Sequence, residues 1–129
     1  MLLEVLDGEF CICKVADTHA VNLDMPWLFV GKTDTELSVV CLVEHAPAQS
    51  LAREDGWRAF RVAGQMDFGL TGVLAGLATV LAQAAISIFA LSTFDTDYIL
   101  VKEEKLAKAL EVLELAGYEV PRAILSPEK

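Results

Sequence analysis

The residues best suited to hold a small charged molecule lie at the two ends of an uncharged stretch of this chain. Residues 69–72 are expected near the start of a helix, where unpaired backbone N–H groups and the helix dipole attract a carboxylate. Asp67, Asp95 and Asp97 supply carboxylates that could accept hydrogen bonds from an ammonium group. Together, donors for an anion and acceptors for a cation are what a zwitterion requires.

Structural roles remain open as alternatives for several of these residues. Asp67 could serve as the N-cap of the expected helix, and Asp95 could close a turn by accepting hydrogen bonds from its own backbone. Gly72 and Gly76 could allow close packing alone. The leucines at helical spacing in the same stretch are expected in the core.

Catalysis and metal binding find little support in the residues. The sequence lacks a nucleophile elbow, a Walker loop and a dinucleotide-binding fingerprint. Cys11 and Cys13 would share one face of a strand and, with His19 or His45, could in principle hold a metal. No paired C-x-x-C spacing occurs, so we expect Cys11, Cys13 and Cys41 to be reduced, metal-free core residues, and we expect no cofactor. A small enzyme using Cys11, Cys13 or His45 is a distant alternative.

Composition narrows the class of protein. The chain has 129 residues, of which 54% are hydrophobic, enough for one sizeable core. Its formal net charge of −9 disfavours nucleic acid and anionic membranes as partners. Residues 68–94 carry no charge, but glycines and polar residues interrupt them and no basic residue flanks them, so we do not predict a membrane span. An odd number of cysteines and no basic segment near Met1 favour the cytoplasm.

Two segments of the chain repeat one pattern of apolar strand, acidic turn and apolar strand. They cover residues 28–41 and 89–102, with identities at Asp34/Asp95, Thr35/Thr96 and Val40/Val101, an offset of 61. Similar strand ends at residues 14–16 and 61–63 are offset by 47. The offsets differ by 14 residues, about four helical turns. The pattern therefore predicts a duplicated unit whose first copy has lost most of a helix.

The remaining elements follow from periodicity and turn signals. We predict a hairpin of strands 2–6 and 9–15 across Asp7-Gly8, a hairpin at 28–43, a short helix at 48–54, a strand at 57–63, a helix at 68–84, a strand at 86–93, a helix from Glu103 to Gly117 and an extended segment at 118–125. Because residues 86–93 are apolar in both parities, each sheet should have helices on one face and a second unit or chain on the other.

Several of these segments resemble the ACT domain, a small β-α-β-β-α-β regulatory module that binds free amino acids. The similarity is carried by Gly64-Gln65-Met66-Asp67-Phe68-Gly69-Leu70-Thr71-Gly72-Val73-Leu74-Ala75, by residues 86–93 and 95–101, and by Trp27 with residues 33–38. More narrowly, the chain looks like the small tandem-ACT proteins related to aspartate kinase regulatory regions and to CASTOR-type amino-acid sensors. It departs from the commoner ACT motif at Phe68, where that motif has proline.

The resemblance implies an α+β, ferredoxin-like fold of tandem ACT units. Residues 1–55 would form a degenerate unit with a truncated first helix and residues 56–129 a complete one, packed as one compact body. The implied function is that of a non-catalytic, amino-acid-binding regulatory module, with an assembly or interaction domain lacking a ligand as the alternative. Partners would be a small amino acid or similar zwitterion, and a homodimer or partner protein. The candidate ligand-binding residues are Asp67, Phe68, Gly69, Leu70, Thr71, Gly72, Ser92, Thr93, Asp95 and Asp97.

Overall fold

The computed structural model describes residues 1–63 and 72–121, which fall into two compact units. Residues 8–57 form one unit, here called the inserted unit. Residues 1–7 and 58–129 form the other, here called the flanking unit. Strand β5 (Ala52–Val62) contributes its first half to the inserted unit and its second half to the flanking unit. The expected boundary between residues 55 and 56 falls inside this strand and stays a prediction.

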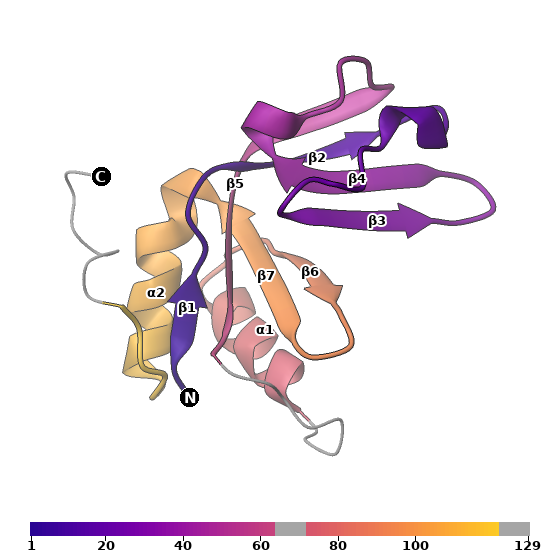
Figure 1. The fold of residues 1–129 in the computed structure, drawn as a ribbon. Helices are drawn as coiled ribbons and strands as arrows, with labels where there is room; N and C mark the ends of the chain where they lie inside the picture. The colour runs from indigo at the N-terminus through magenta and orange to yellow at the C-terminus, as the bar shows by residue number, and fades with distance from the viewer. Residues whose placement is uncertain (64–71, 122–129) are drawn as a thin grey trace. The chain divides into compact units, whose positions relative to one another are not determined.

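The flanking unit is a sheet with two α-helices (Figure 1). Besides the end of β5, its elements are β1 (Leu3–Val5), α1 (Val73–Gln83), β6 (Phe89–Ser92), β7 (Asp97–Lys102), the 3-10 helix η3 (Glu103–Lys105) and α2 (Leu106–Leu115). The strand order is β1-β5-β7-β6, and Leu2 forms a parallel bridge with Glu119 beyond β1. The α+β class is therefore confirmed.

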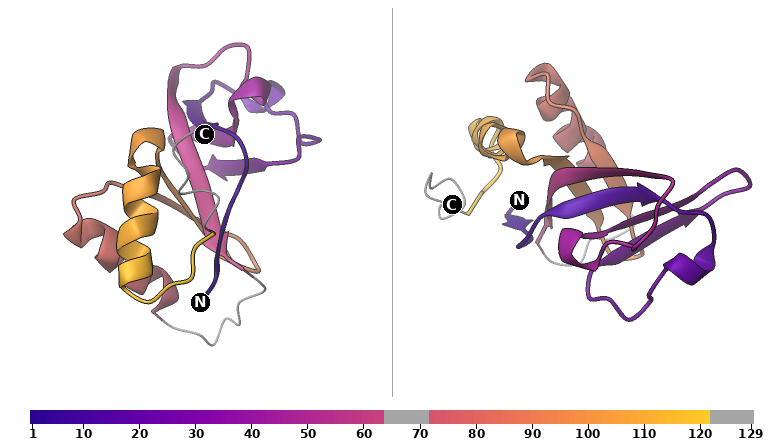
Figure 2. Two further views of the ribbon diagram at one scale, coloured as in Figure 1. Left: turned by 90° about the vertical axis from the view of Figure 1, so that its left-hand side faces the viewer. Right: turned by 90° about the horizontal axis from the view of Figure 1, so that it is seen from above.

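Both helices of the flanking unit pack on the same face of its sheet (Figure 2). Leu77 and Leu81 of α1 form one buried cluster with Leu110 and Leu113 of α2 and with sheet residues such as Phe60. These leucines are at most 2% exposed, as their helical spacing requires. The prediction of helices on one face is confirmed for this unit.

The inserted unit keeps the strand order but not the helices. Its elements are β2 (Phe10–Lys14), η1 (Thr18–Ala20), β3 (Leu28–Lys32), β4 (Leu37–Leu42), η2 (Val43–His45) and the start of β5, in the sheet order β3-β4-β2-β5. The 3-10 turn η1 follows β2, where the flanking unit has α1 after β5. The 3-10 turn η2 follows β4, where the flanking unit has η3 and α2 after β7. The truncated first helix is confirmed, and the loss of the second helix was not predicted. One sheet face is covered instead by Ala20, Val21, Met25 and neighbouring irregular segments.

The duplicated hairpins are present, but their true offset is 60 residues rather than 61. In β3–β4 the last pair is Lys32 with Leu37, and in β6–β7 it is Ser92 with Asp97. Thr33 N–H donates to the Glu36 carbonyl and Thr93 N–H to the Thr96 carbonyl, both at 2.9 Å. The predicted match of Asp34 with Asp95 is therefore wrong by one residue, because it followed identical letters instead of the threonine that closes each turn.

Two other expectations are corrected by the structure. Strand β1 pairs with β5, while β2 pairs with β4 and β5, so residues 2–6 and 9–15 do not form a hairpin. Residues 48–54 are not helical, because β5 already begins at Ala52 and pairs there with Lys14. Across the described residues, neither helix combines the length and apolar character needed to cross a bilayer.

Candidate functional site

The β6–β7 turn brings together three residues of the candidate site, Ser92, Thr93 and Asp97, with Thr96 between them. The Ser92 hydroxyl donates to a carboxylate oxygen of Asp97 at 2.6 Å across the last pair of the hairpin. The Thr93 hydroxyl donates to the Thr96 carbonyl at 3.2 Å and so shares in closing the turn. Asp97 is half-buried, and Ser92 and Thr93 are exposed. Ser92 thus fixes one oxygen of Asp97 and leaves the carboxylate able to accept further hydrogen bonds.

Thr96 is the residue of this turn that sequence reasoning missed. Its side chain is only 7% exposed, and among the described residues its hydroxyl has no hydrogen-bond partner. A buried hydroxyl without a partner costs about 1–3 kcal/mol, so a polar group that supplied the hydrogen bond would stabilise this turn. Only its burial reveals it, since a threonine in a turn is ordinary in sequence.

Gly72 directly precedes α1 and has the left-handed backbone conformation, with φ of 81°. The expected helix over residues 68–84 is therefore wrong at Gly72, and the described helix begins at Val73. The first backbone N–H groups of the described helix are those of Val73, Leu74 and Ala75, which follow the expected residues 69–72. The other residues predicted for this part of the site, Asp67, Phe68, Gly69, Leu70 and Thr71, lie outside the described residues.

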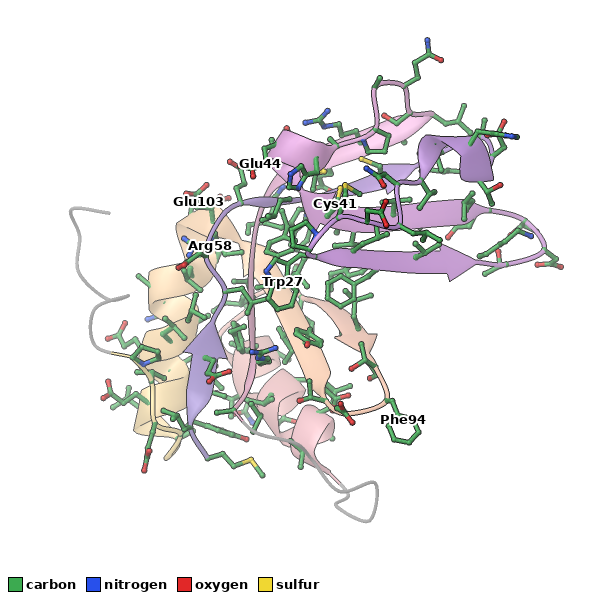
Figure 3. All side chains as sticks on the ribbon, in the orientation of Figure 1. Trp27, Cys41, Glu44, Arg58, Phe94 and Glu103 are labelled. Carbon is green, nitrogen blue, oxygen red and sulfur yellow. The ribbon has the colours of Figure 1, made fainter. Side chains whose placement is uncertain are left out.

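Asp95 and Phe94 form the exposed tip of the β6–β7 turn. Phe94 is 77% exposed and points away from its strands (Figure 3). Hydrogen bonds between Thr93 and Thr96 close the turn. The role of Asp95 as an ammonium acceptor stays a prediction.

A polar cluster on the sheet of the flanking unit was also missed. Arg61 donates to Glu4 at 2.9 Å and to the Tyr98 hydroxyl at 3.1 Å, and its guanidinium lies 5.8 Å from the centre of the Tyr98 ring. The hydrogen bond to Glu4 and then that to Tyr98 raise the pKa of Arg61, which therefore stays charged. Glu4 and Arg61 are paired across β1 and β5, a pairing that sequence alone did not suggest.

The three cysteines lie together in the core of the inserted unit, as predicted for buried hydrophobes. The sulfur of Cys11 is 3.9 Å from that of Cys41 and 3.7 Å from that of Cys13. Cys41 is labelled in Figure 3. All three side chains are at most 1% exposed. Burial raises the pKa of the Cys11 and Cys13 thiols to about 11 and also raises that of Cys41. Such thiols are poor nucleophiles near neutral pH, because the thiolate is the reactive form.

The histidines differ from each other. His19 is a solvent-exposed residue whose backbone N–H caps onto Asp17 at 2.9 Å. His45 is about one-third exposed, with a buried Nδ1 that has no hydrogen-bond partner among the described residues. Within residues 1–63 and 72–121, no three His, Cys, Asp or Glu side chains are grouped as metal ligands.

Comparison with known proteins connects this geometry to a family. Residues 52–114 match the model of the ACT domain. Over 59 residues the chain is 41% identical to the human protein named cytosolic arginine sensor for mTORC1 subunit 1. That match covers 45% of this chain and 18% of the human protein, so the chain spans less than a fifth of that relative.

Solved structures extend the similarity over nearly the whole chain. A crystal structure of a protein from Agobacterium tumefaciens is 30% identical, with a TM-score of 0.82, covering 93% of this chain and 91% of that protein. The regulatory subunit of aspartate kinase from Thermus thermophilus shares the fold at 10% identity, with a TM-score of 0.62, covering 89% of this chain and 96% of that subunit. Residues 52–114 therefore match the ACT domain, and the chain as a whole shares the fold of the aspartate kinase regulatory subunit.

Proposed function

We propose that this protein is a non-catalytic regulatory module that binds a small amino acid or similar zwitterion in the flanking unit. The ligand's ammonium group would lie at the β6–β7 turn, near Asp95 or Asp97. Its carboxylate would lie near Gly72, at the start of α1. The relative named as an arginine sensor and the aspartate kinase regulatory subunit support an amino acid as the class of ligand.

The observation that carries this proposal is the buried Thr96 hydroxyl. It sits in the turn between Ser92 and Asp97, and it lacks a partner among the described residues. A ligand with a polar group would supply that partner and remove the cost of an unsatisfied hydroxyl. Aspartate carboxylates beside it favour a cationic group over an anionic one.

The electrostatic arrangement agrees with a zwitterion. The first amides of α1 carry the positive end of a helix of 11 residues. In the inserted unit the end of β2, the start of η1 and the β3–β4 turn lie at one end of the sheet, since β2 pairs antiparallel with β4 and β3 with β4. The shared strand order implies the same for the end of β5, the start of α1 and the β6–β7 turn.

Isothermal titration calorimetry with the twenty amino acids, L-arginine included, tests the proposal. Asp95→Ala should weaken binding by about 1.5–3 kcal/mol if Asp95 accepts a charge-assisted hydrogen bond from the ligand. Thr96→Val should weaken binding while leaving the free protein as stable or more stable, because it removes an unsatisfied buried hydroxyl. Thr79→Val, on the exposed face of α1, is the matched control.

Two results would contradict the proposal. Unchanged affinity in both Asp95→Ala and Thr96→Val would remove this turn from the binding site. No heat with any amino acid, combined with a stable oligomer in sedimentation, would favour an assembly domain that lacks a ligand.

A further inference from the structure

A groove of about 660 Å³ lies between the two helices of the flanking unit. The end of α1 and one side of α2 line it, with Val80, Gln83, Ala84, Ala85, Lys108, Val112, Leu115 and Ala116. Val80, Ala84 and Val112 form its apolar floor, and each also packs against the buried core of this unit. The other lining residues are exposed. A groove between two rows of helical side chains is shaped to receive side chains from another surface.

Leu115 borders this groove and has the most exposed large apolar side chain among the described residues, at 82%. The other leucines of α2, at positions 106, 110 and 113, are at most 5% exposed, so Leu115 lies off the face that α2 turns to the core. A single exposed leucine is ordinary, but this one adjoins an apolar floor. The flanking unit thus offers an exposed apolar side chain and a receiving groove on one surface. Such self-complementarity is what a two-fold interface between identical chains requires.

The lining of the groove carries no negative charge, although the protein is strongly acidic. The chain has a formal net charge of −9, yet α1 contains no charged residue from Val73 to Gln83. Among the described residues, Lys108 is the one charged side chain that lines the groove. Two copies of an acidic chain repel each other wherever their carboxylates would meet. Contact through this groove avoids that repulsion and places a cation beside an acidic molecule.

Lys108 and Glu111 provide a second self-complementary feature on α2. Their side chains are 58% and 61% exposed, and Lys108 Nζ lies 4.0 Å from Glu111 Oε1. An ion pair so exposed contributes little within one chain, because water screens both charges. Across a two-fold axis, however, Lys108 of each copy can approach Glu111 of the other, which forms two ion pairs at once. An unrelated partner would need matching charges of its own, whereas a second copy supplies them by symmetry.

We propose that this groove is the surface through which two copies of the chain associate about a two-fold axis. Leu115 of each copy enters the groove of the other and lies on Val80, Ala84 and Val112. Lys108 of each copy pairs with Glu111 of the other. The contact is confined to the helices of the flanking unit, so it goes beyond the proposed function and does not require a ligand at the β6–β7 turn. A surface of this limited extent fits a reversible dimer with a dissociation constant of about 1–100 µM.

Sedimentation equilibrium of the ligand-free full chain, from about 1 µM to about 1 mM, tests this association. Leu115→Glu should raise the dimer dissociation constant at least about 100-fold, because each dimer would bury two carboxylates in place of two leucine side chains. The matched control is Leu23→Glu in the inserted unit, which changes a leucine that is 78% exposed and adds the same charge. It should leave the dissociation constant within about twofold of the unchanged chain. Far-UV circular dichroism should be the same for all three proteins, since neither leucine is buried.

Charge reversal tests the paired contacts independently of Leu115. Lys108→Glu and Glu111→Lys should each raise the dissociation constant about fivefold, because each replaces two ion pairs with two like-charge pairs. The double variant Lys108→Glu, Glu111→Lys should return it to within about twofold of the unchanged chain. Net charge alone predicts a different order: Glu111→Lys makes the chain less acidic, so without a specific contact it should strengthen association.

The outcomes decide between this interface and any other. A chain that stays monomeric up to about 1 mM would overturn the proposal. So would a dimer that Leu115→Glu and Leu23→Glu weaken equally, or one that Glu111→Lys strengthens, because the contact would then lie on another surface. A dimer that Leu115→Glu and each single charge reversal weaken, and that the double reversal restores, would establish the interface. Because no amino acid is added, failure of the proposed ligand site would change none of these results.

Discussion

The two units share one plan for their strands and differ in what covers the sheet. In each unit a central strand pairs on one side with the second strand of a hairpin closed by a threonine and on the other side with one further strand. That further strand is β5 beside β2 in the inserted unit and β1 beside β5 in the flanking unit. In the flanking unit two helices bring leucines onto the sheet. In the inserted unit two 3-10 turns and short irregular segments cover a face made of thiols and small aliphatic side chains. The comparison teaches that strand pairing can persist after the helices are reduced.

The loss has two physical consequences in the inserted unit. Smaller side chains fill the space under the shortened segments, which explains why three cysteines gather there. The space is also filled incompletely at one end, where a cavity lies over Val15 and Leu37. In the flanking unit a helix occupies the corresponding position. Reduction of an element thus leaves a cavity on the sheet without disturbing the strand pairing.

The largest expected effect distinguishes the thiol core of the inserted unit from the leucine core of the flanking unit. Burial raises the pKa of Cys11 and Cys13 from 9.0 to about 11, so the unfolded chain releases these protons at lower pH than the folded one. The stabilisation from neutral thiols is therefore complete below pH 9.0 and is lost as the pH rises through about 11. We expect the free energy of unfolding to fall by on the order of 2–3 kcal/mol over that window.

Urea unfolding at a series of pH values measures this loss. The double variant Cys11→Ala, Cys13→Ala should start from lower stability, because it leaves cavities, but should show a shallower decline with pH. It controls for the tyrosines and lysines that titrate in the same range. An identical slope in both proteins would show that the thiols do not titrate as buried groups.

A middle-sized effect tests whether the two turns are equivalent at an offset of 60. Thr33 and Thr93 each use the hydroxyl within the turn, to the carbonyls of Glu36 and Thr96 at 3.3 Å and 3.2 Å. The Thr33 hydroxyl also accepts from the Thr35 and Glu36 N–H groups, and the Thr93 hydroxyl also accepts from the Thr96 N–H. Thr33→Val and Thr93→Val remove these hydrogen bonds without a change of shape, so each should lower the free energy of unfolding by at least about 0.5–1.5 kcal/mol. Thermal unfolding of both variants, with Thr79→Val as the control, measures the two losses. If the two losses of unfolding free energy differ by more than about 1 kcal/mol, the two threonines do not stabilise their turns equally.

The sequence predicted elements that depend on residues close together in the chain, and it failed for strand pairings between distant residues. The helices of the flanking unit, the degenerate first helix and both hairpins were recognisable because their signals are local. The β1–β2 hairpin was wrong because Asp7-Gly8 is a valid turn signal, whereas the partner of β1 lies more than 50 residues away in β5. The register error of one residue arose from identical letters, and in a strand such an error exchanges the two faces.

The candidate site shows the same limit. Ser92, Thr93 and Asp97, which were candidate ligand-binding residues under the family resemblance, do lie together. The buried state of Thr96 and the contact of Arg61 with Tyr98 depend on packing between distant strands, which periodicity does not report. The cavity over Val15 and Leu37 was equally invisible, since an absent helix leaves no pattern of its own.

The smallest expected effect concerns Gly76, which lies in α1 and so has no counterpart in the inserted unit. A Cβ atom at Gly76 would lie 3.1 Å from the Tyr118 hydroxyl oxygen, closer than most such contacts in proteins. Replacing a helical glycine with alanine gains about 1 kcal/mol in helix propensity. The crowded hydroxyl should offset that gain, so Gly76→Ala alone should change stability by less than about 0.5 kcal/mol. In a Tyr118→Phe background the hydroxyl is absent, and Gly76→Ala should then stabilise the protein by about 0.5–1 kcal/mol.

A double-mutant cycle on the free energy of unfolding isolates this coupling. A positive coupling would mean that glycine is retained at position 76 for close packing against Tyr118, as one of the two sequence interpretations holds. If Gly76→Ala stabilises the protein equally in both backgrounds, Tyr118 moves aside without cost and packing does not explain the glycine. The glycine at position 76 would then have to be explained by other neighbours of α1 in the flanking unit. The inserted unit has no such helix and therefore offers no matching position for comparison.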